Sequence, residues 1–179
     1  MKRININVEK IHEDAVIPQF AHNTDSGFDL FTCEDVVIKA GKKAIVPTGL
    51  KFELPYGYGI QIKNKSGITV KGCPIYSYEI IQNENSNKIS DCALRTKKVL
   101  KDERADITVF EGTVDMMYRG EIGLMVKNEE YFDITIPKHT KLAQGVIREI
   151  ITCDFTEVDK VSTDTDRGEG GYGSTGTSK

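Results

Sequence analysis

The chain has 179 residues, a length typical of one domain with a substantial buried core. Hydrophobic residues make up 39% of it and charged residues 28%, which excludes a wholly disordered or collagen-like chain. Its 24 Lys and Arg against 27 Asp and Glu give a formal net charge of -3, which favours neither nucleic acid nor a membrane surface as a partner. Any anionic ligand must therefore be held by local groups.

No apolar run approaches the roughly eighteen residues of a membrane span, and the N-terminus alternates polar and apolar residues, unlike a secretory signal. We therefore expect a cytoplasmic protein. The 4 cysteines contain no Cys-x-x-Cys pair and the 3 histidines are scattered, so we expect neither a zinc site nor a disulfide framework.

Apolar residues at every second position predict strands along residues 1–161. The runs are Ile4, Ile6 and Val8; Leu50, Phe52 and Leu54; Ile60 and Ile62; and Ile134 and Ile136. Turn signals separate them, such as Pro47-Thr48-Gly49, Pro55-Tyr56-Gly57 and Arg119-Gly120. The spacing predicts an all-β sandwich or barrel.

Residues 71–104 interrupt this pattern of alternating apolar residues and turn signals, and we interpret them as an insertion in the β domain. Residues 75–81 are compatible with a strand and 82–88 with an exposed polar loop. Residues 90–104 have the pattern of a short amphipathic helix, with Ser90 as N-cap and Asp91 and Arg95 as an i,i+4 pair.

Residues 162–179 are rich in Ser, Thr and Asp and then in Gly, so they bury too little surface to order alone. We expect a mobile C-terminal arm. Its Arg167, its glycines, its single aromatic Tyr172 and the hydroxyls of Ser174 and Thr175 suit phosphate binding with stacking on a base, although a frayed terminus is the simpler alternative.

Four further segments combine glycine with polar side chains inside strand-like sequence: residues 24–30, 65–68, 111–123 and 141–145. Each alone is a weak signal. Asp115 could be a solvated carboxylate beside a hairpin turn, and Gln144 a surface amide.

Taken in order with the arm, these segments resemble the five motifs of the trimeric dUTP diphosphatase (dUTPase) family: TDSGFDL, KSGI, EGTVDMMYRGE, KLAQG and RGEGGYGSTG. The resemblance covers nearly the whole chain except about 71–104. It implies a distorted jelly-roll barrel and a homotrimer with shared active sites. The chain departs from the family pattern at Asn64-Lys65, where Pro-Arg is usual, so a bidentate phosphate contact becomes a single-point contact.

The resemblance implies hydrolysis of dUTP to dUMP and pyrophosphate, which keeps uracil out of DNA and supplies dUMP for dTMP synthesis. Water would attack the α-phosphorus, with Asp115 as the general base. Asp29 would hold a magnesium ion through the water ligands of the ion.

The resemblance also implies the residues that contact substrate. Gly112, Thr113 and Val114 would read uracil, and Tyr118 would pack on the deoxyribose and exclude a 2′-hydroxyl. The phosphates would be contacted by Lys65, Ser66 and Gly67, and by Gln144 and Arg167 from other chains. When the arm closes, Gly171, Gly173, Ser174 and Thr175 would wrap the triphosphate, and Tyr172 would stack on uracil.

Two alternatives remain open from the sequence. The related dCTP deaminases carry a catalytic Glu five residues after the hairpin glycine, and that position here is Met125, which cannot shuttle a proton. The insertion at 71–104 is not required for hydrolysis, so it could bind a protein partner in a regulatory role, or it could be a surface addition without function.

Overall fold

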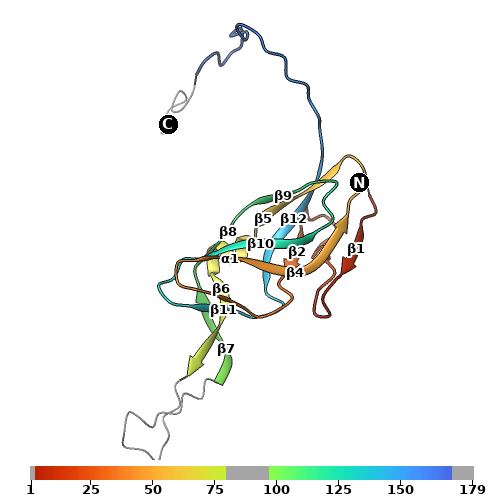
Figure 1. Cartoon of the computed structure of the whole chain (residues 1–179). Coiled ribbons are helices and arrows are strands. Elements are labelled where there is room, and N and C mark those ends of the chain that lie inside the picture. The colour runs from red at the N-terminus through yellow and green to blue at the C-terminus, as the bar shows by residue number, and fades with distance from the viewer. Residues whose placement is uncertain (1–2, 80–96, 171–179) are drawn as a thin grey trace, which may run out of the picture.

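The computed structural model describes residues 3–79 and 97–170. Within them the fold is all-β and jelly-roll-like, with antiparallel strand pairs in sheets that do not close into a barrel (Figure 1). One sheet has the order β1 (Asn7–Lys10), β4 (Lys43–Glu53), β10 (Glu121–Asn128), β8 (Ile107–Val109). The other large sheet has the order β2 (Phe28–Phe31), β12 (Lys141–Glu149), β5 (Tyr58–Asn64), β9 (Gly112–Val114).

Two smaller sheets pair β11 (Ile134–Ile136) with β3 (Val36–Ile38) and β6 (Cys73–Glu79) with β7 (Lys97–Ala105). The helix α1 (Ser66–Lys71) lies between β5 and β6. Figure 1 shows β6 and β7 projecting from the body at the end opposite the root of the C-terminal arm.

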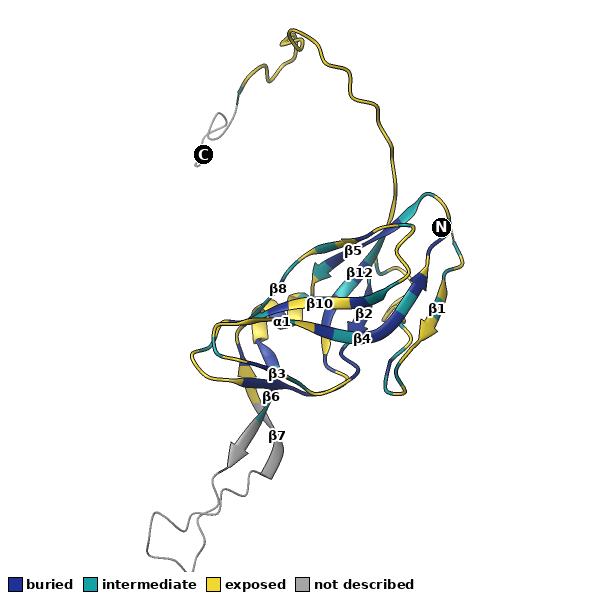
Figure 2. Ribbon diagram, viewed as in Figure 1, coloured by how far each residue is buried: buried dark blue, intermediate teal, exposed yellow. Residues whose placement is uncertain are grey.

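The core lies between the two large sheets and is built from the alternating residues. Leu50 and Phe52 of β4 and Ile60 of β5 are at most 4% exposed, which confirms these predicted strands. Figure 2 shows this alternation as dark blue bands along β4 and β12. At the N-terminus the strand begins only at Asn7, because its pairing partner β4 ends at Glu53 and leaves residues 4–6 without a ladder.

The turn predicted at Pro47–Gly49 is wrong, because these residues continue β4 as a bulge opposite β10. Gly49 has a φ of 67°, and a Cβ there would lie 2.7 Å from the Cβ of His12 and 2.8 Å from that of Ala15. The glycine therefore lets the loop after β1 pack against β4.

The insertion is not helical over the part that the structure describes. From Lys97 onward the segment predicted as a helix forms β7, which pairs with β6, while Ser90, Asp91 and Arg95 lie outside the described residues. Pairing with β6 satisfies the backbone of β7 and outweighs a helical pattern of only a few turns. The strand expected at the start of the insertion is confirmed as β6.

Residues 149–169 are exposed throughout, and Figures 1 and 2 show them leaving the end of β12 and running away from the body. No helix within the described ranges has the length and apolar character of a membrane span.

Candidate active site

A buried carboxylate links the first, second and fourth motifs. Asp29, on β2, is 5% exposed. Its Oδ1 lies 2.7 Å from Nζ of Lys65, and its Oδ2 lies 2.9 Å from Nζ of Lys141. Nε2 of Gln144 donates a longer hydrogen bond of 3.3 Å to Oδ1 of Asp29. We call these four residues the Asp29 cluster.

The Asp29 cluster holds its carboxylate ionised. Burial acts to raise the pKa of Asp29, but hydrogen bonds from Lys65 and Lys141 oppose it, and the net result is a lowered pKa. Two ammonium groups share one carboxylate, so the cluster keeps an excess of positive charge. That excess suits it to a phosphate chain.

Strand register brings the cluster together. In the ladders of β12, Gln144 stands opposite Asp29 of β2 on one side and opposite Lys63 of β5 on the other. Gly145 stands opposite Phe28, and a Cβ at Gly145 would lie 2.4 Å from Cζ of the Phe28 ring. The glycine of the fourth motif therefore leaves room for the aromatic ring of the first.

The sequence assigned Gln144 to a site shared with another chain, but the structure places it beside Asp29 and Lys65 of its own chain. It also adds Lys141, which sequence reasoning missed. The available signal was its position: Lys141 is the first residue of the fourth motif and lies on the strand next to Asp29.

Ser66 and Gly67 form the first turn of α1, directly after Lys65. Both are exposed, and no atom lies within 4 Å of a Cβ built at Gly67. Amides of Ile68 and Thr69 donate to the carbonyl of Lys65 and so fix where its side chain emerges. A ligand bound by Lys65 can therefore approach the backbone of Gly67 closely.

Asp115 lies in the turn that follows β9 and is exposed. Its carbonyl accepts a hydrogen bond from the amide of Tyr118, and Arg119 donates to the carbonyls of Met116 and Tyr118. The hydroxyl of Tyr118 donates to the carbonyl of Glu121 over a distance of 3.0 Å. These bonds order the turn while leaving the carboxylate of Asp115 toward solvent.

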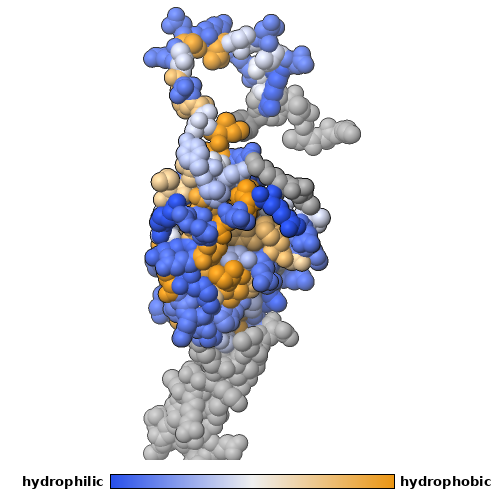
Figure 3. All heavy atoms as spheres, turned by 90° about the vertical axis from the view of Figure 1, so that its right-hand side faces the viewer, coloured by the Kyte–Doolittle hydropathy of each residue, from blue (hydrophilic) through white to orange (hydrophobic). Residues whose placement is uncertain are grey.

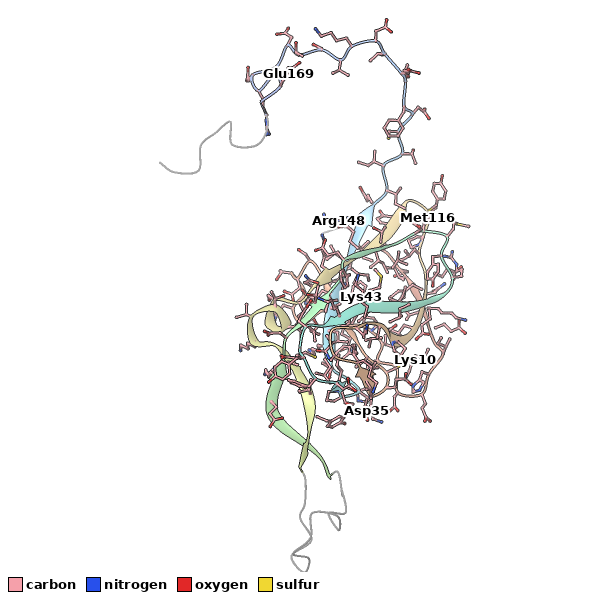
Figure 4. The ribbon with its side chains drawn as sticks, turned by 60° about the vertical axis from the view of Figure 1, so that its left-hand side comes forward. Lys10, Asp35, Lys43, Met116, Arg148 and Glu169 are labelled. Atoms are coloured by element: carbon pink, nitrogen blue, oxygen red, sulfur yellow. The ribbon has the colours of Figure 1, made fainter. Side chains whose placement is uncertain are left out.

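One chain does not bring Asp115 and Lys65 together. Asp115 follows Val114, which pairs with Ile60, whereas Lys65 follows the opposite end of β5. The stretch from Ile60 to Lys65 alone spans about 16 Å at a rise of about 3.3 Å per residue. Figure 4 agrees, since Met116 lies with Arg148 at the end where the arm leaves the body.

The described part of the arm contains Arg167, whose Nε donates to the carbonyl of Gly170 at 2.8 Å. This contact lies within the arm, and Figure 4 shows Glu169 far from the body. Gly171, Tyr172, Gly173, Ser174 and Thr175 lie outside the described residues, so their expected role stays a prediction.

The described residues contain no group of three or more His, Cys, Asp or Glu side chains that could enclose a metal ion. Asp29 is the carboxylate of the cluster, and it already accepts hydrogen bonds on both oxygens. A single carboxylate of this kind suits an ion held mainly by phosphate oxygens and water, as magnesium usually is.

The comparisons with known proteins agree with these features. A family model described as dUTPase matches residues 13–100 and 96–176. The deoxyuridine 5'-triphosphate nucleotidohydrolase of Clostridioides difficile is 33% identical, covering 96% of this chain and 98% of its own length. That of Alkaliphilus metalliredigens is 36% identical, covering 96% and 97%.

Solved structures share the fold. A mutant dUTPase of Staphylococcus bacteriophage 80alpha with dUpNHpp has a TM-score of 0.72 at 22% identity, covering 96% of this chain and 98% of its own. A mutant dUTPase of phage phi11 of S. aureus, described with a structural Mg(II) ion, has a TM-score of 0.65 at 22% identity, covering 88% and 98%.

Proposed function

The chain belongs to the dUTPase family, and on this basis we propose a role for each group of its site in the reaction. The enzyme is a dUTP diphosphatase, which hydrolyses dUTP to dUMP and pyrophosphate. The observation that carries the assignment of residues is the Asp29 cluster, because it gathers side chains of three motifs into one cationic group.

The Asp29 cluster binds the triphosphate. Lys65 and Lys141 are 26% and 50% exposed at their side chains, so each ammonium group can donate to phosphate oxygens while it stays paired with Asp29. Asp29 meanwhile keeps the two ammonium groups close together. Gln144 adds a neutral donor, and the open backbone at Gly67 lets the phosphates approach the chain closely.

Asp115 is the general base. It accepts a proton from a water molecule as the oxygen of that water forms a bond to the α-phosphorus and the bond to the β-phosphate oxygen breaks. The exposed carboxylate can reach such a water, and the hydrogen bonds of Tyr118 and Arg119 hold its turn in place. Cations of the Asp29 cluster offset the negative charge that develops on the leaving pyrophosphate.

The edge strand β9 reads uracil. Its only ladder partner among the described strands is β5, so its outer edge offers backbone donors and acceptors at Gly112, Thr113 and Val114. Tyr118 is 48% exposed beside this strand and can pack on the deoxyribose, where it leaves no room for a 2′-hydroxyl. Tyr172 of the arm completes the base site by stacking.

A magnesium ion, when bound with the triphosphate, would supply positive charge that lowers the repulsion between the phosphates and the attacking water. Asp29 would hold the ion through its water ligands. Lys65 and Lys141 keep this carboxylate ionised, as its lowered pKa indicates.

The active enzyme is a homotrimer with shared sites. Asp115 and Lys65 stand at opposite ends of β5, so a complete site needs Asp115 from a second chain. Ile151 and Phe155, in the segment that joins β12 to the arm, are 90% and 94% exposed, and Figure 3 shows apolar residues along the chain that leaves the body and on the face of the body that carries β1. Such surfaces favour association between copies of the chain.

The test is pyrophosphate release from a panel of nucleoside triphosphates, with and without magnesium. We expect rapid release from dUTP, and little from UTP, dCTP or dTTP. Ammonia release from dCTP would overturn the assignment, although the comparisons support neither deamination nor a regulatory role for the insertion. Met125 also lacks an acid–base group at the deaminase position.

A further inference from the structure

A basic cavity of about 430 Å³ adjoins the Asp29 cluster. It lies between α1, the base of the β6–β7 hairpin and the loop that precedes β12. The Lys and Arg side chains that line it are Lys65, Lys71, Arg104, Lys138 and Lys141, and His139 lies beside them. Lys65 and Lys141 belong to both the cluster and the cavity, so the two form one continuous cationic surface.

Part of this charge is already compensated. Lys65 and Lys141 share Asp29, and Lys138 pairs with Asp14 at 3.0 Å. Lys71 and Arg104 differ, because neither has a carboxylate partner among the side chains that the structure describes. Nη1 of Arg104 donates to the carbonyl of Gly72 at 3.2 Å, and that carbonyl is neutral.

The backbone fixes Arg104 next to the end of α1. Gly72 has a φ of 77°, and a Cβ there would lie 3.1 Å from the Cβ of Arg104. Glycine is therefore needed for the chain to pass from α1 into β6 at this distance from β7. As a result Lys71, the last residue of α1, and Arg104, from the base of the insertion, face the same cavity.

We propose that this basic cavity binds the pyrophosphate portion of the nucleotide, so that Lys71 and Arg104 are further phosphate-binding residues. The cavity suits a compact anion with several charges. Arg104 presents the forked donors that bind phosphate oxygens in pairs, and Lys71 supplies a point charge. This role of the cavity rests on the proposed function, because the pyrophosphate portion belongs to dUTP and is released when dUTP is hydrolysed.

Through Arg104, the base of the insertion takes part in substrate binding. The β- and γ-phosphates extend from Lys65 and Lys141 into the cavity, while the α-phosphate stays at the edge nearest the nucleoside. A nucleoside monophosphate has no group that reaches Lys71 or Arg104. Binding of dUTP and of free pyrophosphate should thus depend on this pair, and binding of dUMP should not.

The experiment measures calorimetric binding of inorganic pyrophosphate and of dUMP, and KM for dUTP, in the full-length Lys71→Met/Arg104→Met double variant. We expect the Kd for pyrophosphate and the KM for dUTP each to rise about tenfold, with kcat and the Kd for dUMP nearly unchanged, because charge-assisted hydrogen bonds to the β- and γ-phosphates are lost. The matched control is Arg3→Met/Lys42→Met, which removes the same charges from exposed positions away from the cavity. The control should leave all of these values as in the wild type.

Unchanged pyrophosphate binding in the double variant would overturn the proposal, as would an equal loss in the control. A loss of pyrophosphate binding without a change in KM would also overturn it, because substrate would then not use the cavity. Arg104→Lys keeps the charge and should bind pyrophosphate far better than Arg104→Met; equal losses would point to a purely structural role. If the wild type failed to hydrolyse dUTP, the proposed function would fail, whereas pyrophosphate titration would still test the cavity.

Discussion

Asp115 stands alone as an exposed carboxylate at the end of β9, whereas the neighbouring Glu111 is paired with Lys63 at 2.7 Å. The two carboxylates flank the same short strand, but of the two only Glu111 has an ion-pair partner within residues 3–79 and 97–170. This difference separates a candidate base from a structural acid and provides a matched pair for mutagenesis.

Asp115→Asn should lower kcat for dUTP by about 10³-fold, because an amide cannot take a proton from water. The affinity for a non-hydrolysable dUTP analogue should stay close to that of the wild type. Steady-state kinetics and calorimetry measure the two quantities. Glu111→Gln is the control and should retain most activity, and normal turnover in Asp115→Asn would remove Asp115 from its role.

Asp29 makes stability depend on acid pH. Its pKa in the folded chain lies below the ordinary value of 3.8, so ionised Asp29 stabilises the fold fully above that pH. The contribution is lost as the pH falls through the lower folded pKa. Asp29→Asn should cost about 2 kcal/mol at neutral pH, since two charge-assisted hydrogen bonds weaken. Thermal unfolding at fixed concentration should show that this difference shrinks as the pH falls below 3.8; a pH-independent gap would contradict it.

At the scale of elements, the β2–β12 ladder positions the Asp29 cluster, and Gly145 sets the spacing of that ladder. The ring of Phe28 occupies the space where a side chain at Gly145 would lie. The ring cannot easily move, because it is 5% exposed, stacks on Phe52 and contacts Phe20 edge to face.

Gly145→Ala should therefore destabilise the fold by about 2 kcal/mol through overpacking. It should also raise KM for dUTP, because β12 carries Gln144 and Lys141. Chemical denaturation and kinetics provide the measurements. Gly67→Ala is the stability control, since no atom lies within 4 Å of its added Cβ, and equal stability losses at both glycines would argue against this account.

At the scale of the whole molecule, the arm and the body are separate in one chain. Every described residue from 149 to 169 is exposed, and Figure 1 shows the arm directed away from the body. Both observations fit an arm that completes a site on another copy of the chain. The separation of Asp115 from Lys65 points to the same arrangement.

Truncation after Asp166 should leave the melting temperature nearly unchanged but lower kcat/KM for dUTP by on the order of 10²-fold, because closure of the arm orients the phosphates. Mixed trimers of this truncated chain and Asp115→Asn, formed by co-expression, should regain activity that neither has alone. Such rescue requires shared sites. A fully active truncated protein would contradict the role of the arm, and light scattering would check the trimer.

Alternating apolar residues were sufficient to predict β4, β5 and the all-β class, since burial on one face of a sheet imposes a period of two. The ordered motifs likewise predicted Asp29, Lys65 and Gln144 as site residues, and the structure brings these three side chains together, while their roles stay predictions. The helix predicted at 90–104 failed where β7 begins, because a strand partner distant in sequence outweighed a local pattern. Lys141, Lys71 and Arg104 emerged only from the tertiary structure. The role proposed for these three residues depends on which charged side chains lie close together in the folded chain. The order of residues along the chain does not give the distances between such side chains.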